Sequence, residues 1–280
     1  MPFALAADGV RLWFEDHGDG DPVVLVHEFG GEPASWDFQV AHFSGRYRCI
    51  AYAARGFKPS DRPDGLERYG QRQATDDLAA VLDHLDIGQA HLVGTSMGSF
   101  TSLDFTLEQP GRVRSLTLVG NSSGPRDADE RERYRTDWLG HEIRSRERSG
   151  GRGAVEVLEQ DPAYRSLQRN LPAIWHDYAE RLSAQSVAGA LNILKTLHWN
   201  RRSIWADEAR LRSIQCPVLL VHGDEDHYLV GETNRYLEGV MPKVSRHLFE
   251  STGHLVNIEK ADRFNGLLDE HLRNAAAGCS

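Results

Sequence analysis

Three polar side chains have the types and spacing of a nucleophile, a base and an acid. Ser96 lies at the centre of Gly94-Thr95-Ser96-Met97-Gly98, a G-x-S-x-G pattern between a short apolar run and a helical one. A sharp turn from strand to helix exposes such a serine, and the flanking glycines leave space that a Cβ would fill. The pattern predicts a serine nucleophile for acyl transfer, which needs a base and an orienting acid.

Two later segments offer the base and the acid. Residues 217–222 form an apolar β-like run that ends in Gly223-Asp224-Glu225-Asp226, and a second run at 245–249 leads to Gly253-His254. Open α/β sheets place their sites where the carboxyl ends of parallel strands meet. We therefore expect His254 to lie near Ser96 as the base, with Asp226 or Asp224 as the acid.

The elements that would position these residues alternate between strand and helix. Helical spacing or a helix stop predicts helices at 71–85, 97–109, 232–240 and 259–274. Short β-like runs predict strands at 10–14, 22–27, 48–53, 90–94, 113–119, 216–222 and 245–249, with a hairpin joining the first two. This alternation is typical of a mostly parallel sheet with helices on both faces.

The alternation stops after Gly120. Residues 121–207 are helical in pattern, so we expect a helical cap inserted into a core of residues 1–120 and 208–280. Charge dominates residues 126–153, and we interpret these charges as a solvated helix surface. The insertion also carries aromatic residues that could roof a pocket. Of these, Trp138, Trp175 and Trp199 are the candidate substrate contacts.

Composition excludes several classes of function. The 280 residues are 40% hydrophobic and 26% charged, which is typical of a globular protein, and the net charge of -9 argues against nucleic acid as a partner. No apolar run is long enough for a membrane span, and the start lacks a signal-peptide pattern, so we expect a cytoplasmic protein without a membrane partner. Cys49, Cys216 and Cys279 have no metal-ligand or disulfide spacing. We expect no metal and no cofactor, and a homodimer is compatible with the sequence.

Taken together, the motifs resemble those of the α/β-hydrolase superfamily. Residues 52–61 are similar to its D-x-R-G-x-G-x-S loop, although Ala53 stands where an aspartate is usual. The resemblance implies an α/β fold with a mostly parallel eight-stranded sheet, flanking helices and a helical cap. It also implies Ser96 as nucleophile, His254 as base and Asp226 as acid, because the family's acid is the third residue after the glycine. Asp224 would then cap the turn.

Two backbone amides would form the oxyanion hole in such an enzyme. One belongs to Met97, the residue after the nucleophile, and the family's H-G-x pattern assigns the other to Phe29. This chain has Glu28 in place of that glycine. Glu28 either pairs with Arg55 or with the region around His27, or positions a substrate group or a water molecule in a dry pocket.

The leading interpretation is a serine hydrolase of a small carboxylic ester, lactone or related acyl compound. A hydrolase of carbon-carbon bonds in ring-cleavage products is the nearest alternative, although such enzymes usually carry an aromatic residue after the catalytic histidine, where this chain has Leu255. A ligand-binding homologue without catalysis is the alternative from another class.

Overall fold

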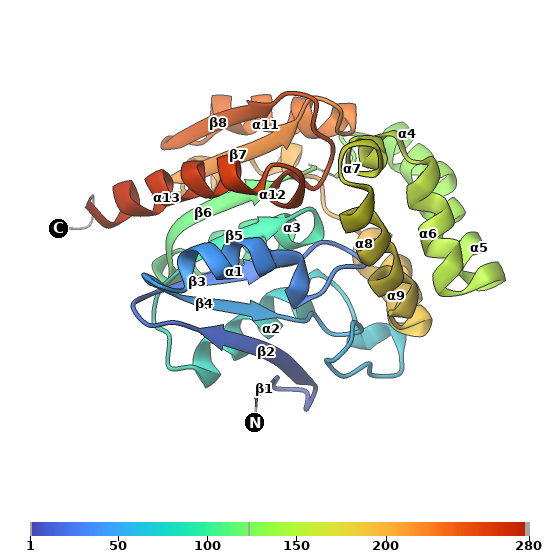
Figure 1. The fold of residues 1–280 in the computed structure, drawn as a ribbon, viewed down its shortest axis with the longest axis horizontal. Helices are drawn as coiled ribbons and strands as arrows, with labels where there is room; N and C mark the ends of the chain where they lie inside the picture. The colour runs from blue at the N-terminus through green and yellow to red at the C-terminus, as the bar shows by residue number, and fades with distance from the viewer. Residues whose placement is uncertain (1, 123, 278–280) are drawn as a thin grey trace.

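A computed structural model describes residues 2–122 and 124–277 and shows one eight-stranded sheet (Figure 1). The spatial order of its strands is β1-β2-β4-β3-β5-β6-β7-β8. β1 pairs antiparallel with β2, β2 pairs antiparallel with β4, and the remaining pairs are parallel. The strands are β1 (Phe3–Leu5), β2 (Arg11–His17), β3 (Asp21–Val26), β4 (Tyr47–Tyr52), β5 (Ala90–Thr95), β6 (Val113–Val119), β7 (Val218–Gly223) and β8 (Val244–Phe249).

The structure corrects one predicted connection. The sequence predicts a hairpin between the strands now seen as β2 and β3, but β4 lies between them in the sheet. β3 pairs in parallel with both β4 and β5 and is therefore an inner strand of the sheet. The antiparallel neighbour of β2 at the sheet edge is instead the three-residue β1, which is too short for a periodic signal.

Helices cover both faces of the sheet, each over its own apolar cluster (Figure 1). Alternate residues of β3 show the division, because Val24 and Val26 join one cluster while Val23 and Leu25 join the other. The first cluster packs against α2 (Gln71–His84), α3 (Met97–Glu108), α10 (Glu208–Arg212) and α11 (Tyr228–Val240). The second packs against α1 (Asp37–Phe43), α12 (Val256–Glu259) and α13 (Ala261–Ala277).

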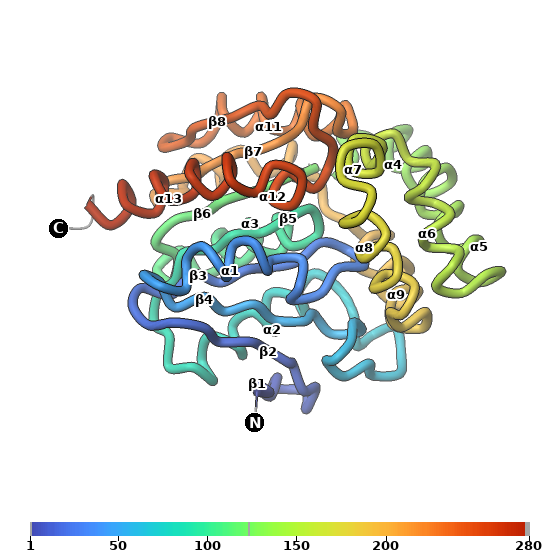
Figure 2. Tube along the Cα trace, in the orientation of Figure 1, coloured from blue at the N-terminus to red at the C-terminus, as the bar shows by residue number. Residues whose placement is uncertain are grey.

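Between β6 and β7 the chain forms a group of helices at the end of the sheet where β5, β6 and β7 finish (Figure 2). These cap helices are α4 (Ala128–Arg133), α5 (Gly140–Ser149), α6 (Gly151–Gln160), α7 (Arg165–Asn170), α8 (Pro172–Ala184) and α9 (Val187–Ile193). Two π-helical segments, Tyr134–Leu139 and Leu194–His198, interrupt the α-helical pattern. The predicted boundaries between core and cap stay a prediction.

Short 3-10 helices lie at Pro33–Trp36, Leu66–Arg68, Pro110–Arg112, Pro162–Tyr164 and Ile204–Ala206. Within residues 2–122 and 124–277, no helix is both long and apolar enough to cross a membrane. Cys49 and Cys216 are free thiols, and Cys279 lies outside the residues that the structure describes.

Candidate active site

Ser96 lies in the tight turn between β5 and α3. Its φ of 53° is in the left-handed region, which a non-glycine residue adopts only under constraint. A Cβ at Gly94 would collide with the backbone of Gly98, and one at Gly98 would collide with the carbonyl of Val26. The glycines of the motif therefore allow the turn to pack directly on β3, and the serine remains partly exposed at the sheet edge.

His254 and Asp226 lie together at the same edge. The imidazole Nδ1 and Asp226 Oδ1 are 2.8 Å apart, and both side chains are buried, at 8% and 1% exposure. Asp226 Oδ1 also accepts the backbone N–H of His227 at 2.7 Å. Asp224 is exposed, and its Oδ1 accepts the N–H of Thr252 at 3.1 Å. The structure thus places Asp226 against the histidine and Asp224 in a turn.

The cap and the core hold His254 from opposite sides. Its backbone N–H donates to the carbonyl of Ala163 in the cap at 2.9 Å, and the Tyr164 ring lies 5.7 Å from the imidazole. On the core side, Cε1 of the imidazole would be 3.0 Å from a Cβ added at Gly120. Gly120 directly follows Val119, whose carbonyl accepts the N–H of Ser96 at 2.8 Å. This chain of contacts brings the imidazole to the neighbourhood of Ser96.

Acidic neighbours set the protonation of His254. Burial alone would lower its pKa, but the charge and hydrogen bond of Asp226 outweigh burial and raise the pKa above its usual value. Asp161 and Glu28 add smaller contributions in the same direction. Since Asp226 holds Nδ1, Nε2 is the nitrogen left to take a proton. Within the described residues Ser96 Oγ forms no hydrogen bond with it, and such bonds are often long without substrate.

The two predicted oxyanion amides, of Met97 and Phe29, have no hydrogen-bond acceptor among the residues that the structure describes. Met97 is the first residue of α3, so its N–H has no acceptor within the helix. The N–H of Phe29 likewise has no acceptor in the described parts of the chain. His27 fixes the Phe29 loop, because its Nδ1 donates to the Glu28 carbonyl at 2.7 Å and its Nε2 accepts the N–H of Ala54 at 2.9 Å. Burial lowers the pKa of His27 to about 4, which keeps the ring neutral for both bonds.

Glu28 is 1% exposed, and the structure corrects its predicted ion pair. Arg55 pairs instead with Asp77 and Asp8, and Glu28 Oε1 accepts the hydroxyl of Ser35 at 2.9 Å. Burial raises the pKa of the Glu28 carboxyl, while Ser35, the nearby Tyr178 hydroxyl and His254 oppose the shift. Oε2 has no hydrogen-bond partner among the described residues. The carboxyl is therefore a buried polar group close to the imidazole without a countercharge.

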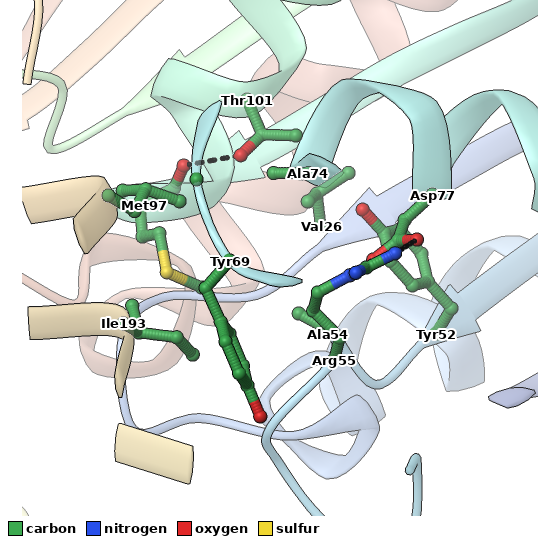
Figure 3. A pocket seen from close by; sticks show the side chains of 12 residues that line it. Val26, Tyr52, Ala54, Arg55, Tyr69, Ala74, Asp77, Met97, Thr101 and Ile193 are labelled. Carbon is green, nitrogen blue, oxygen red and sulfur yellow. Dashed lines mark hydrogen bonds and ion pairs between the residues drawn. The ribbon is translucent and has the colours of Figure 1, made fainter. Parts of the chain in front are cut away.

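A small cavity lies behind the predicted oxyanion residue Met97. Its volume is about 20 Å³, enough for one water molecule, and Tyr69 and Ile193 help to line it (Figure 3). The Arg55–Asp77 ion pair closes its other end, with nitrogen-oxygen distances of 2.5 and 2.6 Å. Arg55, in the loop that resembles the family's D-x-R-G-x-G-x-S pattern, is held by Asp77 and Asp8 from elsewhere in the chain.

The cap aromatics divide into inner and outer rings. Trp138 stacks on Tyr134, with ring centroids 5.4 Å apart, and lies 5.6 Å from the ring of His198. Trp175 lies between Tyr178 and Tyr164, which contacts His254. Trp199 is 38% exposed and stacks under the Arg135 guanidinium on the outside of the cap. The structure therefore does not support Trp199 as a substrate contact.

The sequence predicts a solvated surface for the charged stretch of the cap, and the structure corrects this prediction in part. Arg146 is 3% exposed and forms an ion pair with the buried Glu142 at 3.0 Å. Its guanidinium lies 5.0 Å from the centroid of the Phe29 ring, directly over the predicted oxyanion loop. The i, i+4 spacing of Glu142 and Arg146 signals a helical pair, but only the packing of the cap onto Phe29 shows that the pair is buried.

Sequence reasoning also missed a buried polar network under the site. Asn257 Nδ2 donates to the Ser35 carbonyl at 3.1 Å, and its Oδ1 lies 3.5 Å from the hydroxyl of Thr95, the residue before Ser96. Through Ser35 this network reaches Glu28. The residues come from three distant segments of the chain, so no local pattern could have linked them.

Comparisons with known proteins agree with this fold. The family model for the alpha/beta hydrolase fold matches residues 21–261. A 2-hydroxy-6-oxononadienedioate/2-hydroxy-6-oxononatrienedioate hydrolase of Burkholderia vietnamiensis is 29% identical over 94% of this chain and 91% of its own. Among solved structures, the enol-lactonase of Burkholderia xenovorans matches 97% of this chain and 100% of its own with a TM-score of 0.84 at 20% identity. A thermophilic esterase of Thermogutta terrifontis has a TM-score of 0.83 at 25% identity, covering 98% of both chains.

Proposed function

Because the chain belongs to the α/β-hydrolase fold family and is a hydrolase, we propose that it cleaves a small carboxylic ester or lactone through an acyl-enzyme formed on Ser96. The observation that carries this proposal is the buried His254–Asp226 pair at 2.8 Å beside the constrained turn of Ser96. Such an arrangement provides an activated nucleophile without a cofactor. The Thermogutta esterase supports an ester as the substrate class.

In the proposed reaction, His254 Nε2 takes the proton of the Ser96 hydroxyl as its oxygen attacks the acyl carbon. Asp226 keeps the ring oriented and stabilises the imidazolium that forms. The amides of Met97 and Phe29 donate to the oxyanion, each contributing on the order of 3 kcal/mol to lowering the barrier. His254 then protonates the leaving oxygen, and water activated by the same nitrogen releases the acid.

Covalent labelling tests the proposal directly. We expect a fluorophosphonate to modify Ser96, detected by intact mass and peptide mapping, and 4-nitrophenyl acetate to be hydrolysed with a burst. The Ser96→Ala and His254→Ala variants should lose both signals while keeping the melting temperature of the wild type within a few degrees. A folded wild-type protein that is neither labelled nor active on short esters and lactones would overturn the proposal.

A carbon-carbon bond hydrolase is the second candidate, because the Burkholderia vietnamiensis relative is named for such compounds and aligns over nearly the whole chain. The same residues would serve, so labelling cannot separate the two. The discriminating measurement is the loss of absorbance of 2-hydroxy-6-oxononadienedioate, compared with hydrolysis of an ester of equal size. A kcat/KM at least about 100-fold larger for the dienedioate, equivalent to about 2.7 kcal/mol, would favour the carbon-carbon reaction.

A further inference from the structure

Arg201 is a buried cation at the inner face of the cap. Its side chain is 6% exposed, and Nη2 donates to the carbonyl of Ser122 at 2.8 Å. The guanidinium lies 4.3 Å from the centroid of the Phe100 ring, and Nε has no hydrogen-bond partner within residues 2–122 and 124–277. Its neighbour Arg202 pairs with Asp104 and Asp207, but no carboxylate in the described residues pairs with Arg201. A buried charge without a counterion is costly, so its retention requires a reason.

The surroundings of Arg201 supply further unused polar atoms. His198 is 3% exposed, and its Nδ1 lies 3.1 Å from the hydroxyl of Tyr134, while Nε2 has no partner among the described residues. Burial together with the charges of Arg201 and Arg146 lowers the pKa of His198 to about 3, so the ring is neutral. Asn121, beside Ser122, is fully buried with neither amide atom paired in the described structure.

The charged groups near Arg201 do not compensate its positive charge, and the nearby Arg131 adds another by donating to the Arg201 carbonyl at 3.0 Å. Arg146 and Glu142 neutralise each other in their ion pair. Tyr134 and His198 are uncharged, which leaves the guanidinium of Arg201 uncompensated. An anionic group placed against Arg201 would remove this imbalance and could also use the free nitrogen of His198 and the amide of Asn121.

The group adjoins the reacting atoms. Phe100, under the guanidinium, follows Ser96 by one turn of α3, and its N–H donates to the Ser96 carbonyl. Ser122 is two residues beyond Gly120, which contacts the imidazole of His254. The His198 ring lies 5.0 Å from that of Phe29, the predicted oxyanion residue. The two π-helical segments of the cap meet here through Tyr134 and His198, and such segments often mark functional sites.

We propose that Arg201, His198 and Asn121 form an anion subsite that binds the carboxylate of the substrate. The preferred substrate is then an ester or lactone whose acyl chain ends in a carboxylate. This inference rests on the proposed serine hydrolase function and names its substrate class. Arg201 acts as a specificity residue that contacts the substrate away from the bond that breaks.

A matched pair of esters tests the subsite. The probes are the 4-nitrophenyl monoester of succinic acid and the same ester with its free carboxylate methylated. We expect the wild type to prefer the charged ester by about ten-fold or more in kcat/KM, and Arg201→Gln to abolish that preference. The control is Arg135→Gln, because Arg135 lies over the exposed Trp199 ring on the outer side of the cap. This variant should keep the preference for the charged ester. A wild type without the preference, or an Arg201→Gln variant that retains it, would overturn the proposal.

If Arg201→Gln does not fold, inhibitor binding to the wild-type protein still tests the anion subsite. Hexanoate should inhibit ester hydrolysis competitively with a Ki about ten-fold or more below that of hexanamide, and equal Ki values would overturn the subsite. If neither ester is cleaved and Ser96 is not labelled, the hydrolase proposal fails by itself. The anion subsite is then tested by thermal shift. Hexanoate should raise the Tm of the folded protein, and hexanamide should leave it unchanged. Equal Tm shifts would contradict the subsite.

Discussion

The edge of the sheet and the inner face of the cap differ in how their polar groups are satisfied. At the sheet edge, His254 is bonded to Asp226, Asp226 to the backbone of His227, and Asp224 to that of Thr252. On the cap, Arg201, His198 and Asn121 each keep unpaired polar atoms although they are equally buried. At the sheet edge the polar groups position one another, although Asp226 Oδ2 has no partner among the described residues. The three cap residues have no such mutual bonds, and their unpaired atoms suit a molecule that supplies the missing partners.

The acid should show the largest effect, because Asp226 is the group bonded to the imidazole of His254. Asp226→Asn is expected to lower kcat/KM by about 1,000-fold or more, since an amide cannot stabilise the imidazolium and favours the wrong tautomer. Asp224→Asn is the matched control and should stay within about three-fold, because its carboxylate only caps a turn. The measurement is kcat/KM for ester hydrolysis by both variants. A larger loss in Asp224→Asn than in Asp226→Asn would identify Asp224 as the acid.

The pH profile should follow from the same contacts. The pKa of His254 is raised by Asp226, so kcat/KM should fall about ten-fold per pH unit below an apparent pKa above 6.5 and level off above it. The raised pKa also means that the fold has the full stabilising contribution of this pair below the unfolded value of 6.5 and loses it as pH rises through the folded value. An apparent pKa below 6.5 in the kcat/KM profile would contradict the assigned geometry.

Two tryptophans of the cap sharpen the contrast between its inner and outer sides. Trp138→Ala removes the ring that stacks on Tyr134 next to His198, and we expect it to raise KM by about ten-fold. Trp199→Ala changes an exposed ring and should leave KM within about two-fold. The measurement is the KM of each variant for the charged ester, made on variants whose melting temperatures are equal. Equal effects would mean that the two sides of the cap do not differ in substrate contact.

The smallest expected effect concerns Glu28, a buried carboxyl at the sheet edge whose Oε2 has no partner among the described residues. Since the pKa of Glu28 is raised, the wild type should lose stability as pH rises from about 4.5 through the folded pKa, whereas Gln at this position does not titrate. The Tm of Glu28→Gln should therefore increase relative to the wild type with rising pH, by roughly 2 °C. Glu238→Gln, at a surface position paired with Arg246, serves as the control. Parallel Tm curves for the wild type and Glu28→Gln would show that Glu28 is not penalised by burial.

Much of the core was accessible from the sequence because its signals are local. The predicted strand at 113–119 coincides with β6, and the predicted helix at 71–85 with α2 to within a residue. Periodicity of apolar residues records which faces are buried, and this holds without knowledge of distant contacts. The hairpin prediction failed because pairing between β2 and β4 depends on a strand 30 residues further along the chain, which no turn signal reports.

By itself, the sequence determined the order of Ser96, an acid at 224 or 226, and His254. It also determined the G-x-S-x-G turn and the alternation of strands and helices, since each is a pattern of neighbouring residues. Only the tertiary structure decided that Asp226 rather than Asp224 faces the imidazole, that Arg55 pairs with Asp77, and that Arg201 is buried without a counterion. Burial and pairing are properties of segments that meet in space, and the energy of a charge depends on those neighbours rather than on its place in the chain.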